Sequence, residues 1–285
     1  MFKSAFVSLY LVTAAALTGY AAFALSRGGD PFAWAGVLLT TAPFLVILGW
    51  IMATRAVART SARLPGVTVL AVLGLALTLW SRAYRSAGIE APVLAALGLV
   101  GFLLYAYWYS SLGPRRSQIV IGKRLASIIL RNALGAEISS DDWRGRPSIL
   151  IFFRGNWCPL CMAQIKELAG RYREIEALGV RTALISPQPH ENTAALARTH
   201  NVNFEFYTDT GNVAARALGI DHHGGLPLGM QAMGYDSDTV LPTVIITDVR
   251  GLVIWAHETD NYRVRPEPDV YLEVLRQHAG LIPAQ

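Results

Sequence analysis

Residues 154–161 read Arg154-Gly155-Asn156-Trp157-Cys158-Pro159-Leu160-Cys161, and this motif is the strongest indication of the fold of the second half of the chain. It holds the only two cysteines among 285 residues. An apolar run, Ile149–Phe153, comes directly before it, and apolar residues at helical spacing follow it. The pattern predicts a strand that ends at the motif and a helix that begins there. Cysteines three residues apart would then share the first helical turn, close enough to form a disulfide.

The two thiols are predicted to form a redox pair. A helix N-terminus carries partial positive charge and stabilises a thiolate. We therefore expect Cys158, at the corner, to be the nucleophile with a lowered pKa and Cys161 to be the resolving residue. A zinc site would need two further ligands, and the chain has no second cysteine pair. Two buried structural cysteines would not need a tryptophan before them and a proline between them. No metal and no cofactor is expected.

Two neighbours of the thiols are candidates for supporting roles. Arg154 has two open interpretations: a catalytic cation that stabilises the thiolate, or a surface charge at the end of the strand. Trp157 is expected to pack over the thiols and shield them from water.

The first part of the chain has the composition of a membrane region. The chain is 53% hydrophobic with a mean hydropathy of +0.35. Apolar stretches of roughly membrane-spanning length lie at about residues 5–25, 33–53, 67–80 with flanks, and 91–112. They predict a transmembrane four-helix region over residues 1–113, with the lipid bilayer as a partner. These stretches contain no Cys, His, Asp, Glu or Lys, which favours an anchor or a partner-docking bundle over a thiol relay or a proton pathway.

The charge is divided between the two parts. Residues 1–116 carry a net +7 and residues 117–285 a net −2, which together give the +5 of the whole chain. The basic balance thus comes from the membrane part, and no nucleic-acid partner is expected. Eight basic residues against three favour both termini on the cytoplasmic side. The sequence predicts a multi-pass protein of a bacterial cytoplasmic membrane, with its second domain on the cytoplasmic side.

The second part, residues 114–285, alternates short strands with helices. This order predicts an α/β domain. Strands are expected at 127–130, 136–139, 148–153, 180–186, 204–207, 243–248 and 252–256. Helices are expected from the cysteine motif to Gly179, and at 191–200, 211–218 and 268–279. Residues 221–240 are expected to be a Gly-rich loop.

Several of these stretches together resemble the alkyl hydroperoxide reductase/thiol-specific antioxidant superfamily, the peroxiredoxin-like branch of the thioredoxin fold. The resemblance runs from about Ile119 to the C-terminus. It is carried by Ile138–Pro147, Phe153–Cys161, Ile185-Ser186-Pro187, Leu241–Asp248 and Asp260–Pro268. It implies an α/β thioredoxin-like fold in which Pro242 lies beside the active cysteine.

The resemblance also implies an activity. A membrane-anchored thiol oxidoreductase would reduce peroxides or disulfides through Cys158 and Cys161, and an external thiol reductant such as a thioredoxin would restore the pair. Well-studied peroxiredoxins place Thr or Ser, and Pro, where this chain has Gly155 and Ile151. A disulfide oxidoreductase without peroxidase activity is therefore an open alternative, and so is a non-enzymatic membrane redox sensor or scaffold. Arg263 and Arg265 are expected in a solvated loop; the open alternative, implied by the resemblance, is that one of them places its guanidinium near the thiolate.

Overall fold

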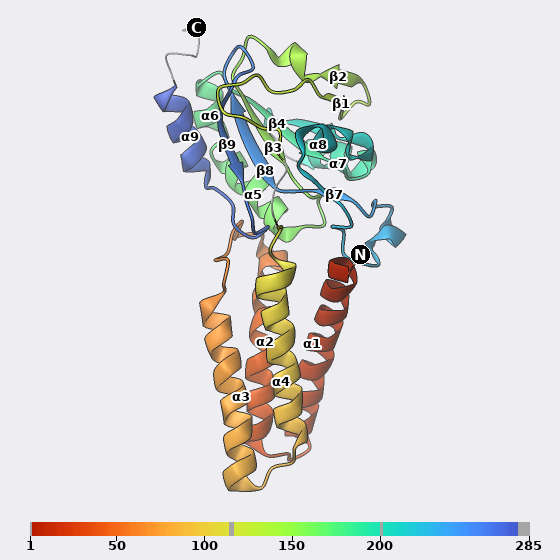
Figure 1. The fold of residues 1–285 in the computed structure, drawn as a ribbon, viewed down its shortest axis with the longest axis vertical. Coiled ribbons are helices and arrows are strands. Elements are labelled where there is room, and N and C mark those ends of the chain that lie inside the picture. The colour runs from red at the N-terminus through yellow and green to blue at the C-terminus, as the bar shows by residue number, and fades with distance from the viewer. Residues whose placement is uncertain (1, 114–116, 200–201, 279–285) are drawn as a thin grey trace. The chain divides into compact units, whose positions relative to one another are not determined.

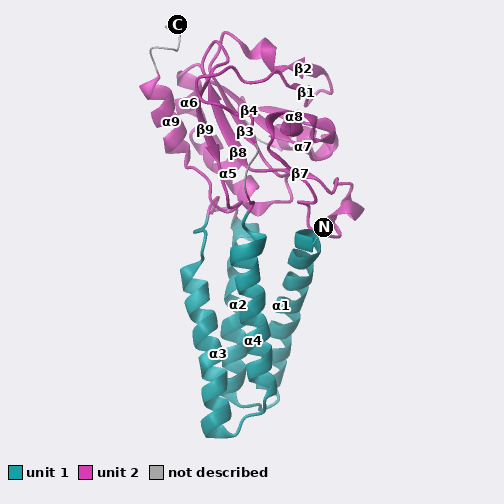
Figure 2. Cartoon of the chain, in the orientation of Figure 1, with its two compact units in different colours: residues 1–54, 60–111 teal, residues 55–59, 112–285 magenta. Residues whose placement is uncertain are grey.

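The computed structural model describes residues 2–113, 117–199 and 202–278. The chain divides into two compact units, residues 1–54 with 60–111, and residues 55–59 with 112–285 (Figure 2). The domain boundary predicted between residues 113 and 114 falls at the edge of 114–116, which lie outside the described residues. Arg115 and Arg116, two of the basic residues used to predict orientation, lie there too.

The first unit consists of four long apolar helices (Figure 1). They are α1 (Phe2–Ser26), α2 (Pro31–Thr54), α3 (Pro65–Arg85) and α4 (Glu90–Leu103), the last continued by a π-helical segment, Leu104–Tyr109. All four are long and apolar enough to cross a membrane. The prediction of four apolar helices in this part of the chain is confirmed.

Glycines let the helices of this unit approach closely. A Cβ atom at Gly36 of α2 would lie 2.5 Å from the carbonyl oxygen of Gly74 in α3. A Cβ atom at Gly98 of α4 would lie 2.8 Å from Oγ1 of Thr40 in α2. Small residues at a helix–helix contact allow two backbones to approach this closely.

Gly36→Val is therefore expected to destabilise the helical unit by about 1–3 kcal/mol, the usual effect of overpacking a close contact. Thermal unfolding of the full chain in detergent, followed by tryptophan fluorescence, measures the loss. Gly49→Val is the matched control, since a Cβ atom at Gly49 meets nothing within 4 Å. Equal unfolding midpoints for the two variants would show that the α2–α3 approach does not hold the unit together.

The second unit is built on a seven-stranded sheet with the order β2-β1-β5-β4-β3-β8-β9. The strands β3, β4 and β5 are parallel, and the remaining pairings are antiparallel. A separate two-stranded sheet pairs β6 with β7. The bounds are β1 (Ile129–Asn132), β2 (Glu137–Ser139), β3 (Ser148–Phe152), β4 (Arg181–Ser186), β5 (Glu205–Thr208), β6 (Asp221–His222), β7 (Thr239–Val240), β8 (Thr243–Thr247) and β9 (Val253–Glu258).

Helices cover both faces of this sheet (Figure 1). Leu150 and Phe152 of β3 belong to one core cluster with Ala214 and Leu218 of α8. On the other face α5 and α9 contact each other through Gln164 and Tyr271. The helices are α5 (Pro159–Gly170), α6 (Tyr172–Ala177), α7 (His190–Thr199), α8 (Val213–Leu218) and α9 (Pro268–Gln277). Every residue of β3 is buried, as expected of a central strand with both faces covered.

The α/β fold predicted from the sequence is confirmed, with two local differences. The helix expected to run from the motif to Gly179 is broken at Gly170–Arg171 into α5 and α6. The loop expected at 221–240 contains the β6–β7 pair and a short 3-10 turn, Met230–Met233. The predicted helix ends at His200 and Ala279 lie outside the described residues.

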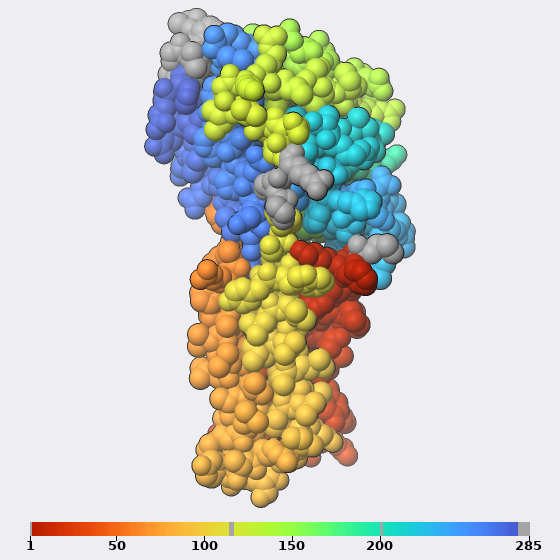
Figure 3. All heavy atoms as spheres, viewed as in Figure 1, coloured from red at the N-terminus to blue at the C-terminus, as the bar shows by residue number. Residues whose placement is uncertain are grey.

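The segment near residues 120–125 lies against the last hairpin of the sheet. In Figure 3 this yellow-green segment lies beside blue atoms of the region near residue 250. The backbone amide of Leu125 donates to the carbonyl of Gly251, and that of Gly122 donates to Val253. This segment therefore closes the sheet at the β9 side.

Candidate functional site

The cysteine motif lies at the corner between β3 and α5. Gly155 has φ +142°, and a Cβ atom there would approach Nε1 of Trp157 to 2.6 Å. A side chain at Gly155 would therefore strain the backbone and would require the indole of Trp157 to shift.

Both cysteines are free thiols and both are buried, Cys158 at 2% and Cys161 at 0% exposure. Cys158 is the N-cap of α5, and Pro159 occupies the first helical position, where its missing N–H leaves no bond unmade. Cys161 lies on the first turn, as the spacing predicted. Their oxidation to a disulfide stays a prediction.

A buried guanidinium contacts both sulfurs. Nη2 of Arg265 lies 3.4 Å from Sγ of Cys161 and 3.9 Å from Sγ of Cys158. Nη1 of Arg265 donates to Oε1 of Gln164 at 2.6 Å. Nε2 of Gln164 in turn donates to the hydroxyl of Tyr271 at 3.1 Å. The arginine is therefore held in place by two other buried side chains.

The expectation that Arg263 and Arg265 lie in a solvated loop was wrong. Their exposures are 2% and 5%. Arg265 follows Cys161 by 104 residues, and no local sequence pattern predicts the contact between them. The superfamily resemblance of the stretch Asp260–Pro268 was the only sequence signal that this arginine belongs to the site. No sequence signal indicated that Gln164 and Tyr271 support it.

The electrostatics favour a thiolate on Cys161. Burial opposes its ionisation, but the hydrogen bond from Cys158 and the charge of Arg265 outweigh burial and lower the pKa of Cys161 to about 5. The hydrogen bond to Cys161, together with burial, raises the pKa of Cys158 well above its ordinary value. The two thiols share one negative charge and titrate as a unit. The lowering of the pKa expected at Cys158 is opposed by the hydrogen bond between the two thiols and by burial, which outweigh the charge of Arg265 there.

Arg154 is buried, with 3% exposure, so it is not a surface charge. Its guanidinium lies between the rings of Trp157, at 4.7 Å, and Tyr262, at 5.1 Å. Nη2 of Arg154 donates to the carbonyl of Gly225, and Oγ1 of Thr239 donates to the carbonyl of Arg154. Arg154 therefore links the cysteine motif to residues 225 and 239 by hydrogen bonds. Its positive charge also lowers the pKa of Cys161.

The other two predicted site residues lie nearby. Trp157 is half-buried and stacks on Arg154. Pro242 is buried immediately before Thr243, which pairs with Phe152 at the end of β3. The peptide bond before Pro242 is trans. Pro242 therefore lies at the same end of the sheet as the cysteine motif.

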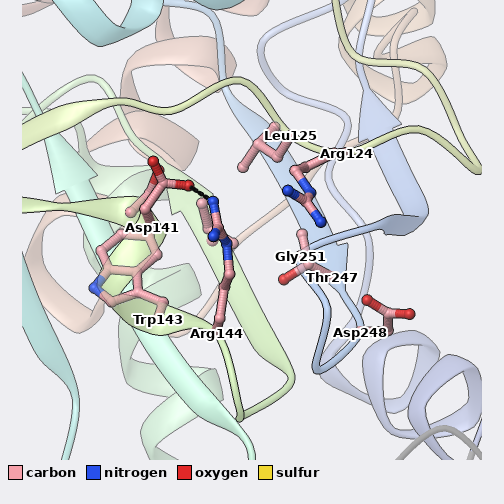
Figure 4. A pocket seen from close by; sticks show the side chains of 10 residues that line it. Arg124, Leu125, Asp141, Trp143, Arg144, Thr247, Asp248 and Gly251 are labelled. Carbon is pink, nitrogen blue, oxygen red and sulfur yellow. Dashed lines mark hydrogen bonds and ion pairs between the residues drawn. The ribbon is translucent and has the colours of Figure 1, made fainter.

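A small cavity lies at the opposite end of β3 (Figure 4). It has a volume of about 30 Å³, and Thr247, which lines it, pairs with Ser148 at the start of the strand. Asp141 and Arg144 form an ion pair at its edge. Substrate pockets are roughly ten times larger, so this cavity has room for water only. Within the described ranges, no group of three His, Cys, Asp or Glu residues is placed to bind a metal.

The second part of the chain is similar to known proteins. The model of the AhpC/TSA family matches residues 121–256. Peroxiredoxin Q, chloroplastic, of Sedum lineare is 23% identical over 130 residues, which are 45% of this chain and 69% of that protein. Among solved structures, peroxidoxin BcpB from Mycobacterium tuberculosis is similar with a TM-score of 0.47 at 16% identity, covering 56% of this chain and 98% of that one. A peroxiredoxin-like protein from Aquifex aeolicus gives a TM-score of 0.48 at 14% identity, covering 59% and 90%.

Proposed function

We propose that this chain is a membrane-anchored thiol oxidoreductase that reduces peroxides through Cys158 and Cys161. Its second unit has a peroxiredoxin-like α/β fold, and the model of the AhpC/TSA family matches residues 121–256. The observation that carries the proposal is the contact of one buried guanidinium, Arg265, with both sulfurs. A thiolate is the nucleophile in this chemistry, and a fixed cation keeps it ionised at neutral pH.

The proposed cycle has three steps. The Cys161 thiolate attacks one oxygen of the peroxide, the O–O bond breaks, and the leaving oxygen takes a proton from solvent to become water or an alcohol. The sulfur of Cys158 then attacks the Cys161 sulfenic acid, water leaves, and a disulfide forms. An external dithiol such as a thioredoxin returns two electrons and two protons. Arg265 stabilises the thiolate by its positive charge, while Arg154 and Trp157 pack against each other beside the cysteines.

A second candidate is disulfide exchange, in which the thiolate attacks the sulfur of a substrate disulfide. Gly155 favours it for attack by Cys158, because no hydroxyl is present three residues before that cysteine to orient a peroxide. The four apolar helices support membrane anchoring. The bias of basic residues supports a cytoplasmic location for the thiol site, in a bacterial cytoplasmic membrane.

Turnover by the full chain in detergent tests the proposal. We expect consumption of hydrogen peroxide and of a lipid hydroperoxide with dithiothreitol as reductant. The Cys158→Ser/Cys161→Ser double variant should show only the background rate. Turnover of a protein disulfide such as insulin without peroxide consumption would select the second candidate. Loss of both activities would leave a redox sensor or scaffold and overturn the proposed enzyme.

A further inference from the structure

The segment Arg55–Arg59 joins α2 to α3 in the sequence, yet it packs as part of the second unit. Ala58 is fully buried there. Arg59 forms ion pairs with Glu167 of α5 and, at 3.4 Å, with Glu267. Nη2 of Arg59 also lies 3.5 Å from the carbonyl oxygen of Pro266. One side chain thus connects a helix of the thiol site with the loop that follows Arg265.

These two connected segments are the ones that hold Arg265. Glu167 follows Gln164 by three residues on α5, about one helical turn. Gln164 accepts a hydrogen bond from Arg265. Pro266 is the next residue after Arg265, and its carbonyl also accepts a hydrogen bond from the hydroxyl of Tyr271 at 3.5 Å. Arg59 therefore acts on both supports of the guanidinium that contacts the sulfurs.

We propose that Arg59 is a positioning residue of the thiol site, so that the segment between α2 and α3 completes a site whose cysteines lie about 100 residues later in the chain. The inference rests on the proposed thiol chemistry.

The expected effect is on reactivity more than on folding. The side chains of Arg59 and Glu167 are 26% and 29% exposed, and ion pairs so close to solvent contribute little to stability. The interaction of a cation with a buried thiolate, in contrast, depends steeply on distance. A small displacement of Arg265 from Cys161 should therefore raise the pKa of the thiol pair without unfolding the unit.

The test is the pH dependence of alkylation of the reduced full chain in detergent by iodoacetamide. Only two thiols exist in the chain, so the rate reports the site directly. Arg59→Gln should raise the apparent pKa by about half a unit or more, a several-fold loss of rate on the acid side. Glu167→Gln should do the same, and the double variant should add little to the larger single effect. Arg59→Lys should restore part of the shift.

Arg63→Gln, an exposed arginine shortly after the same segment, is the matched control and should leave the profile unchanged. The thermal midpoint should be close to that of the parent chain in every variant. An unchanged profile for Arg59→Gln and Glu167→Gln, or strictly additive effects, would overturn the positioning role. Alkylation needs no turnover, so a chain that reduces neither peroxide nor disulfide but shows the Arg59 effect would refute the proposed function alone.

Discussion

Cys161→Ser is expected to lower the rate of reaction with hydrogen peroxide by roughly 100-fold or more, because it removes the sulfur that carries the stabilised thiolate. Cys158→Ser should instead react once and stop. In that variant Arg265, at 3.4 Å, still faces Cys161, but no second thiol is present to convert the sulfenic acid into a disulfide. The two variants should therefore fail at different steps of one cycle.

Mass spectrometry after one equivalent of peroxide distinguishes the two failures. The Cys158→Ser chain should gain one oxygen, and a dimedone adduct should map it to Cys161. The Cys161→Ser chain should remain reduced, with circular dichroism like that of the parent chain as the folding control. A sulfenic acid trapped on Cys158 instead would show that the corner residue attacks first, as the motif alone had suggested.

Arg265→Met is expected to raise the pKa of the thiol pair and to slow the reaction. The pKa of Cys161 is about 5 in the intact site, so the thiolate is almost fully formed at neutral pH. If the cation is lost and the thiol returns to an ordinary pKa near 8.5, the thiolate fraction at pH 7 falls roughly 30-fold. The rate in the parent chain should rise with pH through about 5 and then level off. In the variant the same rise should occur several pH units higher.

The pH profile of peroxide reaction or of alkylation measures this shift. At pH above 9 the variant should recover most of the parent rate, because the thiol ionises without help. Arg263→Met is the matched control, since it removes an equally buried guanidinium two residues away. A variant that is slow at every pH would indicate a collapsed site, and one with an unchanged profile would mean that Arg265 does not stabilise the thiolate.

Much of the fold follows from signals that are local in the sequence. The apolar run before the cysteine motif predicts β3, because a strand buried on both faces needs a continuous apolar stretch. Helix α5 follows from the apolar spacing and from Pro159 at its start. The four long apolar stretches predict helices, because length and hydropathy are properties of the segment itself. The break at Gly170 was missed because the apolar spacing continues across it.

Local sequence patterns are sufficient to predict the α/β class of the second unit, the four apolar helices, and the place of both cysteines at a strand-to-helix corner. The contact of both sulfurs with one guanidinium follows from the tertiary structure. Arg265, more than 100 positions away in the chain, lies 3.4 Å from Cys161 and 3.9 Å from Cys158. The tertiary structure also brings Arg59 and Glu167 together as an ion pair. Helix and strand formation depend on neighbours in the chain, whereas thiolate stability depends on the nearest charges in space, which the folded chain alone brings together.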